Sequence, residues 1–240
     1  MQTNNIYEQR KHIDIVLPAY NPHINWEKGV AVNFHDLCAM FQEYDFSLYI
    51  ATDGSVRGFE PDVVSFLKDE VKGVKIVDHA VNMGKGFALR SAVKHCSGDW
   101  VIYIDYDFPY TFESISKVVA ALRDGADVVI AARADSYQKN LPFVRKMLSY
   151  ASHAVNRFVF RLPFKDTQGG MKGFNRRGRE LFLQTTINTF LFDTQFIYKS
   201  VKSGADVRVV DAEIKNGLKV SVMGLKVLFK ELKNICEIWK

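Results

Sequence analysis

Two carboxylates, Asp105 and Asp107, stand one residue apart directly after an apolar run, Val101–Ile104. Such runs predict a buried strand, and ligands of open α/β sheets bind at the carboxyl ends of strands. Residues i and i+2 of a strand face the same way, so both carboxylates should stand at the mouth of a cleft. Mg²⁺ is commonly held by one or two carboxylates together with substrate phosphates. The pair therefore indicates a site for Mg²⁺ or Mn²⁺. The alternative is a strand end with two solvated acids, one of them capping the next helix.

Three more loops with polar or glycine-rich sequences follow predicted strands. They are Pro18–Asn21, Thr52–Ser55 and Asn82–Gly86. Parallel strands of a doubly wound sheet end on the same side, so these loops should converge with the loop that carries Asp105. Taken singly, Asp53-Gly54-Ser55 is typical of a turn. Gly84-Lys85-Gly86 is neither a Walker A loop nor a GxGxxG loop, and alone it is typical of a helix start that needs small residues.

The elements that must position these loops alternate over the first 135 residues. Apolar runs predict strands at His12–Leu17, Phe46–Ala51, Val74–Val77, Val101–Ile104 and Asp127–Ala132. Helical spacing and a proline start predict helices at Trp26–Tyr44, Pro61–Val71, Ala88–Val93 and Ser114–Leu122. This alternation predicts an α/β fold with a doubly wound, mostly parallel sheet flanked by helices.

The second part of the chain is less regular. It predicts helices at Pro142–Phe160 and Phe192–Val201, a glycine-rich segment at Asp166–Phe174 and a strand at Val207–Val210. Because no repeat or low-complexity linker is visible, we expect a single domain over residues 1–240. Residues 218–240 have the pattern of a basic amphipathic helix. Through residues 225–240 it could lie on an anionic membrane, or it could pack on the domain with its lysines solvated.

The composition narrows the class of protein. A net charge of +5 suits a phosphate-bearing ligand or an anionic membrane surface, and no nucleic-acid-binding motif accompanies it. Cys38, Cys96 and Cys236 form no CxxC pair, which fits a reducing compartment without a zinc or disulfide framework. The sequence shows neither a signal peptide nor an apolar run that could span a bilayer. We expect a cytoplasmic location, with peripheral contact at the inner face of the membrane as a further option.

The ordered set of motifs resembles that of family 2 glycosyltransferases of the GT-A fold. The motifs are Pro18-Ala19-Tyr20-Asn21, Thr52-Asp53-Gly54-Ser55, Asn82-x-Gly84-Lys85-Gly86 and the DxD motif Asp105-x-Asp107. Later segments are similar to polyprenyl-phosphate sugar transferases, the dolichyl-phosphate glucose and mannose synthases. These segments are Ala132-Arg133, Arg145-Lys146, Asp166–Phe174, Phe192-Asp193 and Lys219-Val220-Ser221-Val222. The run Asp166–Phe174 is more similar to the glucose type, and the resemblance covers residues 12–240.

The resemblance implies roles for these residues. The loop Pro18–Asn21 and the turn Asp53–Ser55 would hold the nucleotide, with Asp53 accepting from an imide N–H of the base. Nucleotide-sugar contacts are also implied for Asn82, Gly84, Lys85 and Asp105. Asp105 and Asp107 would place the metal ion on the diphosphate. The acceptor phosphate would meet Arg133, Arg145 and Lys146. The expected catalytic residues are Asp107, Asp193 and Arg133.

The role of Asp193 depends on the acceptor. In relatives that glycosylate hydroxyl groups, an acid near this place acts as general base, because a hydroxyl nucleophile must lose its proton. A phosphate acceptor is already anionic, so Asp193 could then orient the sugar or the metal site. A helix N-cap after Phe192 is the structural alternative. The sequence also departs from the family pattern at Pro22, where glutamate is usual, and at Thr52, where aspartate is usual.

The resemblance implies an inverting, metal-dependent transferase that moves a hexose from a nucleotide diphosphate sugar, UDP-linked in preference to GDP-linked, to a polyprenyl phosphate. The halves would be a nucleotide-sugar-binding part, residues 12–135, and an acceptor part, residues 136–217. One alternative is a cytosolic relative that acts on a sugar hydroxyl. A second is a sugar nucleotidyltransferase, whose glycine-rich first loop is missing here. A third is a non-catalytic binder of nucleotide sugars.

Overall fold

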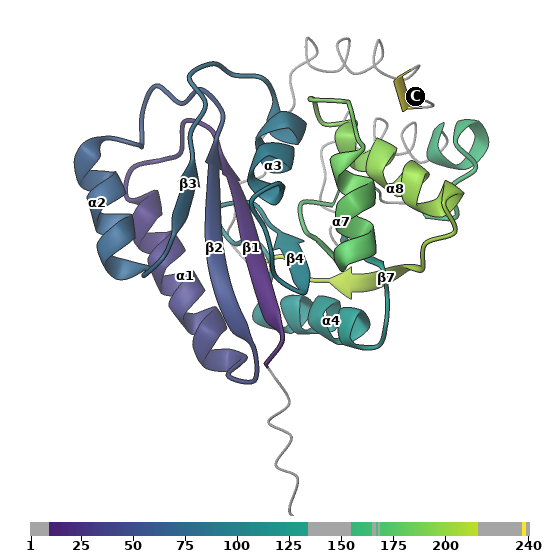
Figure 1. Ribbon diagram of the computed structural model, residues 1–240, viewed down its shortest axis with the longest axis horizontal. Coiled ribbons are helices and arrows are strands. Elements are labelled where there is room, and N and C mark those ends of the chain that lie inside the picture. The colour runs from purple at the N-terminus through teal and green to yellow at the C-terminus, as the bar shows by residue number, and fades with distance from the viewer. Residues whose placement is uncertain (1–9, 134–154, 165–166, 168, 216–236, 239–240) are drawn as a thin grey trace, which may run out of the picture.

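The computed structural model describes residues 10–133, 155–164, 167, 169–215 and 237–238. Its strands are β1 His12–Ala19, β2 Asp45–Thr52, β3 Lys75–Val77, β4 Trp100–Tyr103, β5 Val128–Arg133, β6 Lys172–Phe174 and β7 Val207–Ala212. They form one seven-stranded sheet in the order β3-β2-β1-β4-β6-β5-β7. The sheet twists strongly, so that β1 and β2 run upright in Figure 1 while β7 lies nearly across them.

Helices cover both faces of this sheet (Figure 1). They are α1 Trp26–Met40, α2 Pro61–Glu70, α3 Lys85–Val93, α4 Phe112–Arg123, α7 Arg176–Leu183 and α8 Phe192–Lys202, with a π-helical turn at Val155–Val159. Alternate residues of a strand face opposite sides. Ile15 and Leu17 of β1 therefore join the core with α1, α2 and α4, whereas Val16 joins the core with α3, α7 and α8.

The predicted α/β class and mostly parallel sheet are confirmed. Each strand and helix predicted within residues 12–133 and 192–212 is present, with small shifts of its ends. The predicted helix Trp26–Tyr44 is shorter, because α1 ends at Met40 and the chain turns, with Tyr44 N–H donating to Phe41 O at 3.0 Å. Two elements were not predicted, β6 and α7. β6 is antiparallel to both of its neighbours, β4 and β5.

The two carboxylates follow a strand, as predicted, but the strand repeat does not extend to them. β4 ends at Tyr103, and Asp105 and Asp107 lie in the turn that follows. The Phe108 N–H donates to Asp105 O at 2.9 Å, and Phe108 itself has a φ of 45° while its ring is buried. The buried ring holds the backbone in this left-handed conformation, so a turn, and not the strand repeat, sets the relation of the two carboxylates.

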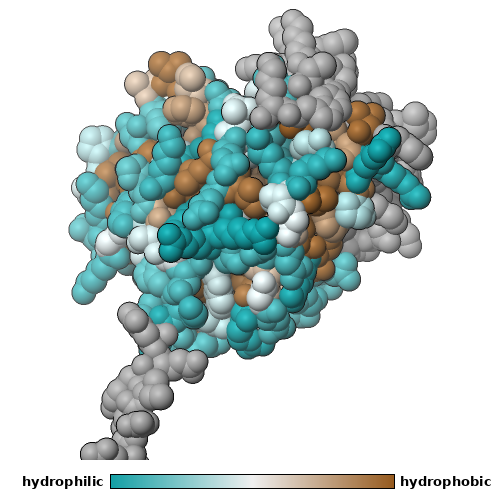
Figure 2. Space-filling view, turned by 45° about the vertical axis from the view of Figure 1, so that its right-hand side comes forward, coloured by the Kyte–Doolittle hydropathy of each residue, from teal (hydrophilic) through white to brown (hydrophobic). Residues whose placement is uncertain are grey.

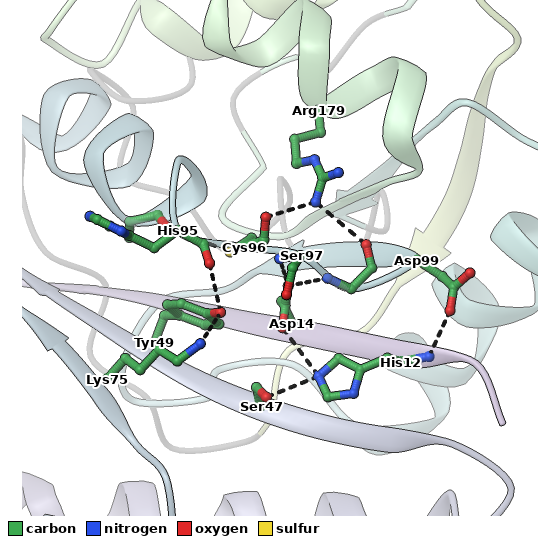
Figure 3. A network of polar contacts seen from close by, with 12 residues as sticks. His12, Asp14, Ser47, Tyr49, Lys75, His95, Cys96, Ser97, Asp99 and Arg179 are labelled. Atoms are coloured by element: carbon green, nitrogen blue, oxygen red, sulfur yellow. Dashed lines mark hydrogen bonds and ion pairs between the residues drawn. The ribbon is translucent and has the colours of Figure 1, made fainter. Parts of the chain in front are cut away.

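A buried polar network at the amino ends of the strands fixes the start of β4 (Figure 3). Asp14 of β1 is fully buried, and its Oδ2 accepts from the N–H groups of Ser97 at 2.8 Å and Gly98 at 2.7 Å. Its Oδ1 lies 3.3 Å from Nε2 of His12. Nε2 of His12 is also 2.9 Å from Ser47 Oγ of β2. β1 thus anchors the turn that leads into the strand before Asp105.

Two further side chains, Tyr49 and Arg179, bind the same turn, residues 95–98 (Figure 3). The Tyr49 hydroxyl donates to His95 O at 2.9 Å and accepts from Lys75 Nζ at 2.8 Å. Arg179 of α7 donates from Nη1 to Cys96 O at 2.8 Å. These bonds use polar groups that burial would otherwise leave unsatisfied. They place the network at the sheet edge opposite the four polar loops.

The predicted C-terminal helix at 218–240 lies outside the described residues except for Glu237 and Ile238. Ile238 is fully buried and joins the core with Phe192 and Phe196. Nε2 of Gln195 donates to Glu237 O at 2.9 Å. Glu237 and Ile238 therefore pack against α8. Among the described helices, none has the length and apolar character that crossing a bilayer requires.

Candidate active site at the carboxyl edge of the sheet

Lys85 and Asp105 form an ion pair at the carboxyl edge of the sheet. Lys85 is the first residue of α3, and its Nζ donates to Asp105 Oδ1 at 2.6 Å. Burial lowers the pKa of the Lys85 ammonium, but the nearby carboxylates, Asp105 first, outweigh burial and raise its pKa overall. The lysine is thus fixed as a cation beside the motif Asp105-x-Asp107.

Asp107 lies two residues further along the turn, and its side chain is exposed. Partial loss of the water around this carboxyl raises its pKa, and the charge of Asp105 raises it further. A raised pKa means that the folded chain disfavours the charged form. The two carboxylates therefore repel each other in a position where an added cation would relieve the repulsion.

This donor set fits a divalent cation that also binds phosphate oxygens. Mg²⁺ and Mn²⁺ prefer oxygen ligands, and Mg²⁺ is often held by one or two carboxylates plus substrate phosphates. The attraction of Asp105 for the ammonium of Lys85 shows that the carboxylate already accepts a cationic partner. Over the described parts of the chain, His, Cys, Asp and Glu side chains nowhere gather in groups of three that could hold a metal ion.

Gly84 and Gly86 bring the start of α3 against the segment before α8. A Cβ on Gly86 would lie 2.6 Å from Ile187 O and 2.7 Å from the Phe192 Cβ. The Gly86 N–H donates to Asn188 O at 2.8 Å. One turn later, buried Arg90 donates from Nη1 to Ile187 O at 2.7 Å. Both glycines are therefore needed for the approach of two backbones, and this approach orients Lys85.

Asp53 organises the neighbouring loop. Its carboxylate is almost fully buried and accepts from the N–H groups of Met83 at 2.8 Å and Gly84 at 2.9 Å. Gly54 has a φ of 68°, and its N–H donates to His79 O at 2.9 Å. Asp53 thus fixes the start of α3 through backbone contacts. Its predicted contact with a nucleotide base is tested by nothing in the structure and stays a prediction.

The first two polar loops are bonded to each other. The Oδ1 of Asn21 accepts from the Val56 N–H at 2.9 Å, and the Asn21 N–H donates to Ser55 Oγ at 3.0 Å. Trp26 of α1 donates from Nε1 to Gly58 O at 2.9 Å. The predicted convergence of these loops is thus present. Pro18 and Ala19 end β1, and Tyr20 next to them is half exposed.

Asp193 lies in a buried cluster with Lys172 and Tyr103. Oδ1 of Asp193 accepts from Lys172 Nζ at 2.7 Å and from the Tyr103 hydroxyl. Lys172 is completely buried and also donates to Gly169 O at 2.9 Å. Burial and the charge of Asp193 raise the pKa of Tyr103 well above its usual value, which keeps the phenol a neutral donor. Asp193 is not the helix N-cap, because α8 begins at Phe192 with Leu191 as its cap.

The glycine-rich segment joins this cluster to the DxD motif. The Gly170 N–H donates to the Tyr110 hydroxyl oxygen at 2.9 Å, and a Cβ on Gly170 would lie 2.5 Å from Asp105 Oδ2. A Cβ on Gly169 would lie 2.5 Å from Ala131 O. A side chain at Gly170 would require the carboxylate of Asp105 to move. The segment therefore carries Lys172 on one side and contacts the first carboxylate of the motif on the other.

The predicted acceptor-phosphate residues are the least described part of the site. Arg133 is the last residue of β5, and its backbone is opposite Ala212 of β7. Arg145 and Lys146 lie outside the described residues. Asn82 is exposed beside Gly54, at the mouth of the site.

Sequence reasoning missed three residues that shape the site: Lys172, Tyr103 and Tyr110. Lys172 could have been found, because a lysine inside the run Gly-Gly-Met-Lys-Gly-Phe has no place in an apolar strand unless it meets a carboxylate. Tyr103 and Tyr110 gave no such signal, since aromatic residues suit a strand and its flanking turn.

A family model for glycosyl transferase family 2 matches residues 14–182. A dolichyl-phosphate beta-glucosyltransferase of Trichomonas vaginalis is 23% identical over 235 residues, covering 93% of this chain and 72% of the relative. The dolichol-phosphate mannosyltransferase of Pyrococcus furiosus is 24% identical over 237 residues, covering 95% of this chain and 64% of the relative. The glycosyltransferase AglD of Haloferax volcanii is 26% identical over 216 residues, and this chain, matched over 88% of its length, spans 34% of it.

Solved structures share the fold. Glucosyl-3-phosphoglycerate synthase from Mycobacterium tuberculosis, in complex with Mn²⁺, uridine-diphosphate and phosphoglyceric acid, superposes with a TM-score of 0.61 at 18% identity, covering 95% of this chain and 77% of that one. A mannosyltransferase from Pyrobaculum calidifontis, in complex with GDP-Man and Mn²⁺, superposes with a TM-score of 0.58 at 16% identity, covering 86% of this chain and 57% of that one. The predicted GT-A fold is thereby confirmed.

Proposed function

The chain belongs to glycosyl transferase family 2, and on that basis we propose that it moves a hexose from a nucleotide diphosphate sugar to a polyprenyl phosphate. The relatives named dolichyl-phosphate beta-glucosyltransferases support a lipid phosphate as acceptor. A UDP-sugar is the favoured donor, because the run Asp166–Phe174 is more similar to the glucose-type synthases.

The observation that carries the choice of acceptor is the contact between Lys172 and Asp193. A general base must bind the proton of its nucleophile in the transition state. The same oxygen of Asp193 already accepts from a buried ammonium, 2.7 Å away, and from the Tyr103 hydroxyl. The oxygen that would take that proton is therefore already occupied by two hydrogen-bond donors. This arrangement suits an acceptor that arrives already ionised, as a phosphate does.

The remaining residues would act on the donor. Asp105 and Asp107 would hold Mg²⁺ or Mn²⁺, which when bound neutralises charge on a leaving diphosphate. Lys85, held against Asp105, would add a positive charge at the same edge. The loop Pro18–Asn21 and Asp53 would position the nucleotide. Asp193 would orient the sugar.

Transfer would then proceed by single displacement. An oxygen of the acceptor phosphate attacks the anomeric carbon from the face opposite the nucleotide. The bond between that carbon and the diphosphate oxygen breaks, and the diphosphate leaves with the bonding electrons. The product has the inverted configuration at the anomeric carbon, and no proton needs to be removed from the nucleophile. Retention of configuration would contradict this mechanism.

A transfer assay tests the proposal. It uses labelled UDP- and GDP-sugars, Mg²⁺ or Mn²⁺, and a polyprenyl phosphate in detergent, with Asp107→Ala as the inactive variant. Asp69→Ala removes an exposed carboxylate at the end of α2 and serves as matched control. We expect label in the lipid only with metal and intact Asp107, and full activity in Asp69→Ala.

Two results would overturn parts of the proposal. Donor hydrolysis without labelled lipid would keep the glycosyltransferase and reject the phosphate acceptor, and sugar hydroxyls would become the next acceptors to try. Equal transfer by Asp107→Ala would reject the metal site at the DxD motif.

A further inference from the structure

Large apolar side chains are exposed to solvent on three loops at the carboxyl edge of the sheet. Ile24 and Val56 are each 89% exposed, and Val81 is 66% exposed. Tyr20 and Met83 on the same loops are about half exposed. We call these five side chains the apolar rim. Figure 2 shows apolar surface projecting at the top of the molecule, the edge toward which β1 and β2 point in Figure 1.

The loops of the apolar rim are bonded into one surface. The loop of Ile24 is tied to the loop of Val56 through Asn21, whose Oδ1 accepts the Val56 N–H at 2.9 Å. The loop of Val56 is tied to the loop of Val81, because the Gly54 N–H donates to His79 O at 2.9 Å. These contacts, one to the Asn21 side chain and one between backbones, hold the tips in place before anything binds. Docking the rim would therefore order few additional residues.

The charged side chain between the tips is Arg57. Residues 20–25, 54–59 and 79–84 contain this arginine but no aspartate or glutamate, and the exposed carboxylates Glu60 and Asp78 lie directly outside these ranges. Arg57 is exposed, and from Nη2 it reaches Asn21 O at 3.5 Å. Aliphatic tips beside an exposed arginine suit the interface of an anionic bilayer, where apolar side chains enter the headgroup layer and cations meet lipid phosphates.

We propose that the apolar rim docks on the surface of an anionic lipid bilayer, with Ile24 and Val56 entering the headgroup layer. The inference rests on the proposed function in one respect: the phosphate of a polyprenyl phosphate lies at the bilayer surface, so the mouth of the site must approach it. The rim lies at that mouth, because Met83 and Asp53 share a hydrogen bond of 2.8 Å next to Lys85. This contact surface is separate from the predicted one at 225–240.

Vesicle sedimentation tests the docking directly. The full chain is mixed with vesicles of phosphatidylcholine containing a minority of phosphatidylglycerol, and bound protein is measured against lipid concentration. The test variant is Ile24→Asp/Val56→Asp. The matched control is Val32→Asp/Met40→Asp, which changes two exposed side chains of α1, 59% and 56% exposed, outside the three loops. Thermal unfolding checks that both variants fold.

The rim variant should bind vesicles roughly tenfold to hundredfold more weakly, since it replaces two inserted aliphatic side chains by carboxylates. The control should bind like the original chain. Wild-type binding by the folded rim variant would overturn the proposal. So would a fall of equal size in both variants, because it would reflect net charge alone.

A second readout follows the side chain itself. In Val56→Trp, the added indole should be quenched by brominated lipids, whereas in Val32→Trp the added indole should not. Quenching that is equal in the two variants would overturn the docking geometry. If the rim instead pairs two copies of the chain, light scattering will show a dimer that Ile24→Asp/Val56→Asp abolishes, with no vesicle binding, and this too would overturn the proposal.

The docking and the proposed function can fail independently of each other. The rim variant should lose transfer to polyprenyl phosphate in vesicles but keep transfer to a short, water-soluble prenyl phosphate. Transfer to the soluble acceptor without any vesicle binding would reject the docking and keep the function. Vesicle binding through the rim without transfer to either acceptor would reject the function and keep the docking.

Discussion

Lys172 is a buried ammonium group whose anionic partner within the described chain is Asp193, 2.7 Å away. A buried charge is tolerated when it is paired and hydrogen-bonded, and here Gly169 O and Asp193 Oδ1 accept from Nζ. The Tyr103 ring lies 5.5 Å from Nζ and adds a cation–π contact. The pair therefore fixes the position of Asp193.

Removing one member of this pair should destabilise the protein far more than removing both. Lys172→Met leaves a buried carboxylate without its cation, and we expect a loss of about 3–5 kcal/mol in the free energy of unfolding. Lys172→Met/Asp193→Asn removes both charges of this pair and should recover most of the lost stability. Urea unfolding of the two single variants and the double variant measures the coupling. Additive losses would contradict a direct contact.

The double variant also separates the two roles of Asp193. If Asp193 orients the sugar for a phosphate acceptor, Lys172→Met/Asp193→Asn should keep kcat within about tenfold, with an unchanged pH profile. Loss of a general base would instead reduce kcat by roughly 10²–10⁴-fold and remove a basic limb from the profile. The kcat and its pH dependence, measured with polyprenyl phosphate, decide between them.

Asp107 and Asp105 should have opposite effects on stability without metal. The fold raises the pKa of Asp107, so the folded chain binds this proton more tightly than the unfolded chain. The contribution of Asp107 to stability therefore falls as the pH rises from its unfolded to its folded pKa. Asp107→Asn should raise the melting temperature at neutral pH, and the gain should vanish below the unfolded pKa. Asp105→Asn should lower the melting temperature, because Lys85 loses its nearest carboxylate.

Thermal unfolding across pH, with and without Mg²⁺ and UDP, measures both effects. Added Mg²⁺ and UDP should raise the melting temperature of the original chain but not that of Asp107→Asn, since a ligand stabilises the state that binds it. A lower melting temperature for Asp107→Asn without metal would contradict the raised pKa.

At the scale of elements, the contact between α3 and the segment before α8 positions Lys85. Gly86→Ala would place a methyl group 2.6 Å from Ile187 O and should cost about 1–3 kcal/mol of unfolding free energy. Gly29→Ala is the matched control, because Gly29 is also helical but has no atom within 4 Å of the added Cβ. The control should gain about 0.5–1 kcal/mol. Chemical denaturation of both variants checks that the free energy of unfolding falls in Gly86→Ala and rises in Gly29→Ala.

Elements with a clear repeat could be predicted from the sequence, and short ones could not. The apolar runs of β1 and β2 fix a strand without reference to distant residues. β6 has only three residues and contains a glycine, so its strand conformation comes from pairing with β4 and β5. The conformation of the turn after β4 could not be predicted for a similar reason, since the positive φ of Phe108 depends on burial of its ring.

At the scale of the whole molecule, the site combines residues far apart in sequence. Lys85 meets Asp105 across 20 positions, whereas Tyr103 meets Asp193 across 90. The strand-end rule predicted the first kind of contact, because it depends only on parallel strands. The second kind requires the sheet order, in which β6 lies between β4 and β5. No local pattern encodes that order, and for this reason Asp193 was identified without its partners.

The insertion of β6 also has a consequence for how the chain folds. β4 and β5 follow each other in the sequence, but the strand that joins them in the sheet begins only at Lys172. In a nascent chain, the edges of β4 and β5 that β6 covers therefore stay unpaired until that residue has been synthesised, and such edges are sites of aggregation. In pulse-labelling hydrogen exchange during refolding, we expect the amides of β1 and β2 to become protected before those of β6. A chain that stops before Lys172 should depend on chaperones to stay monomeric.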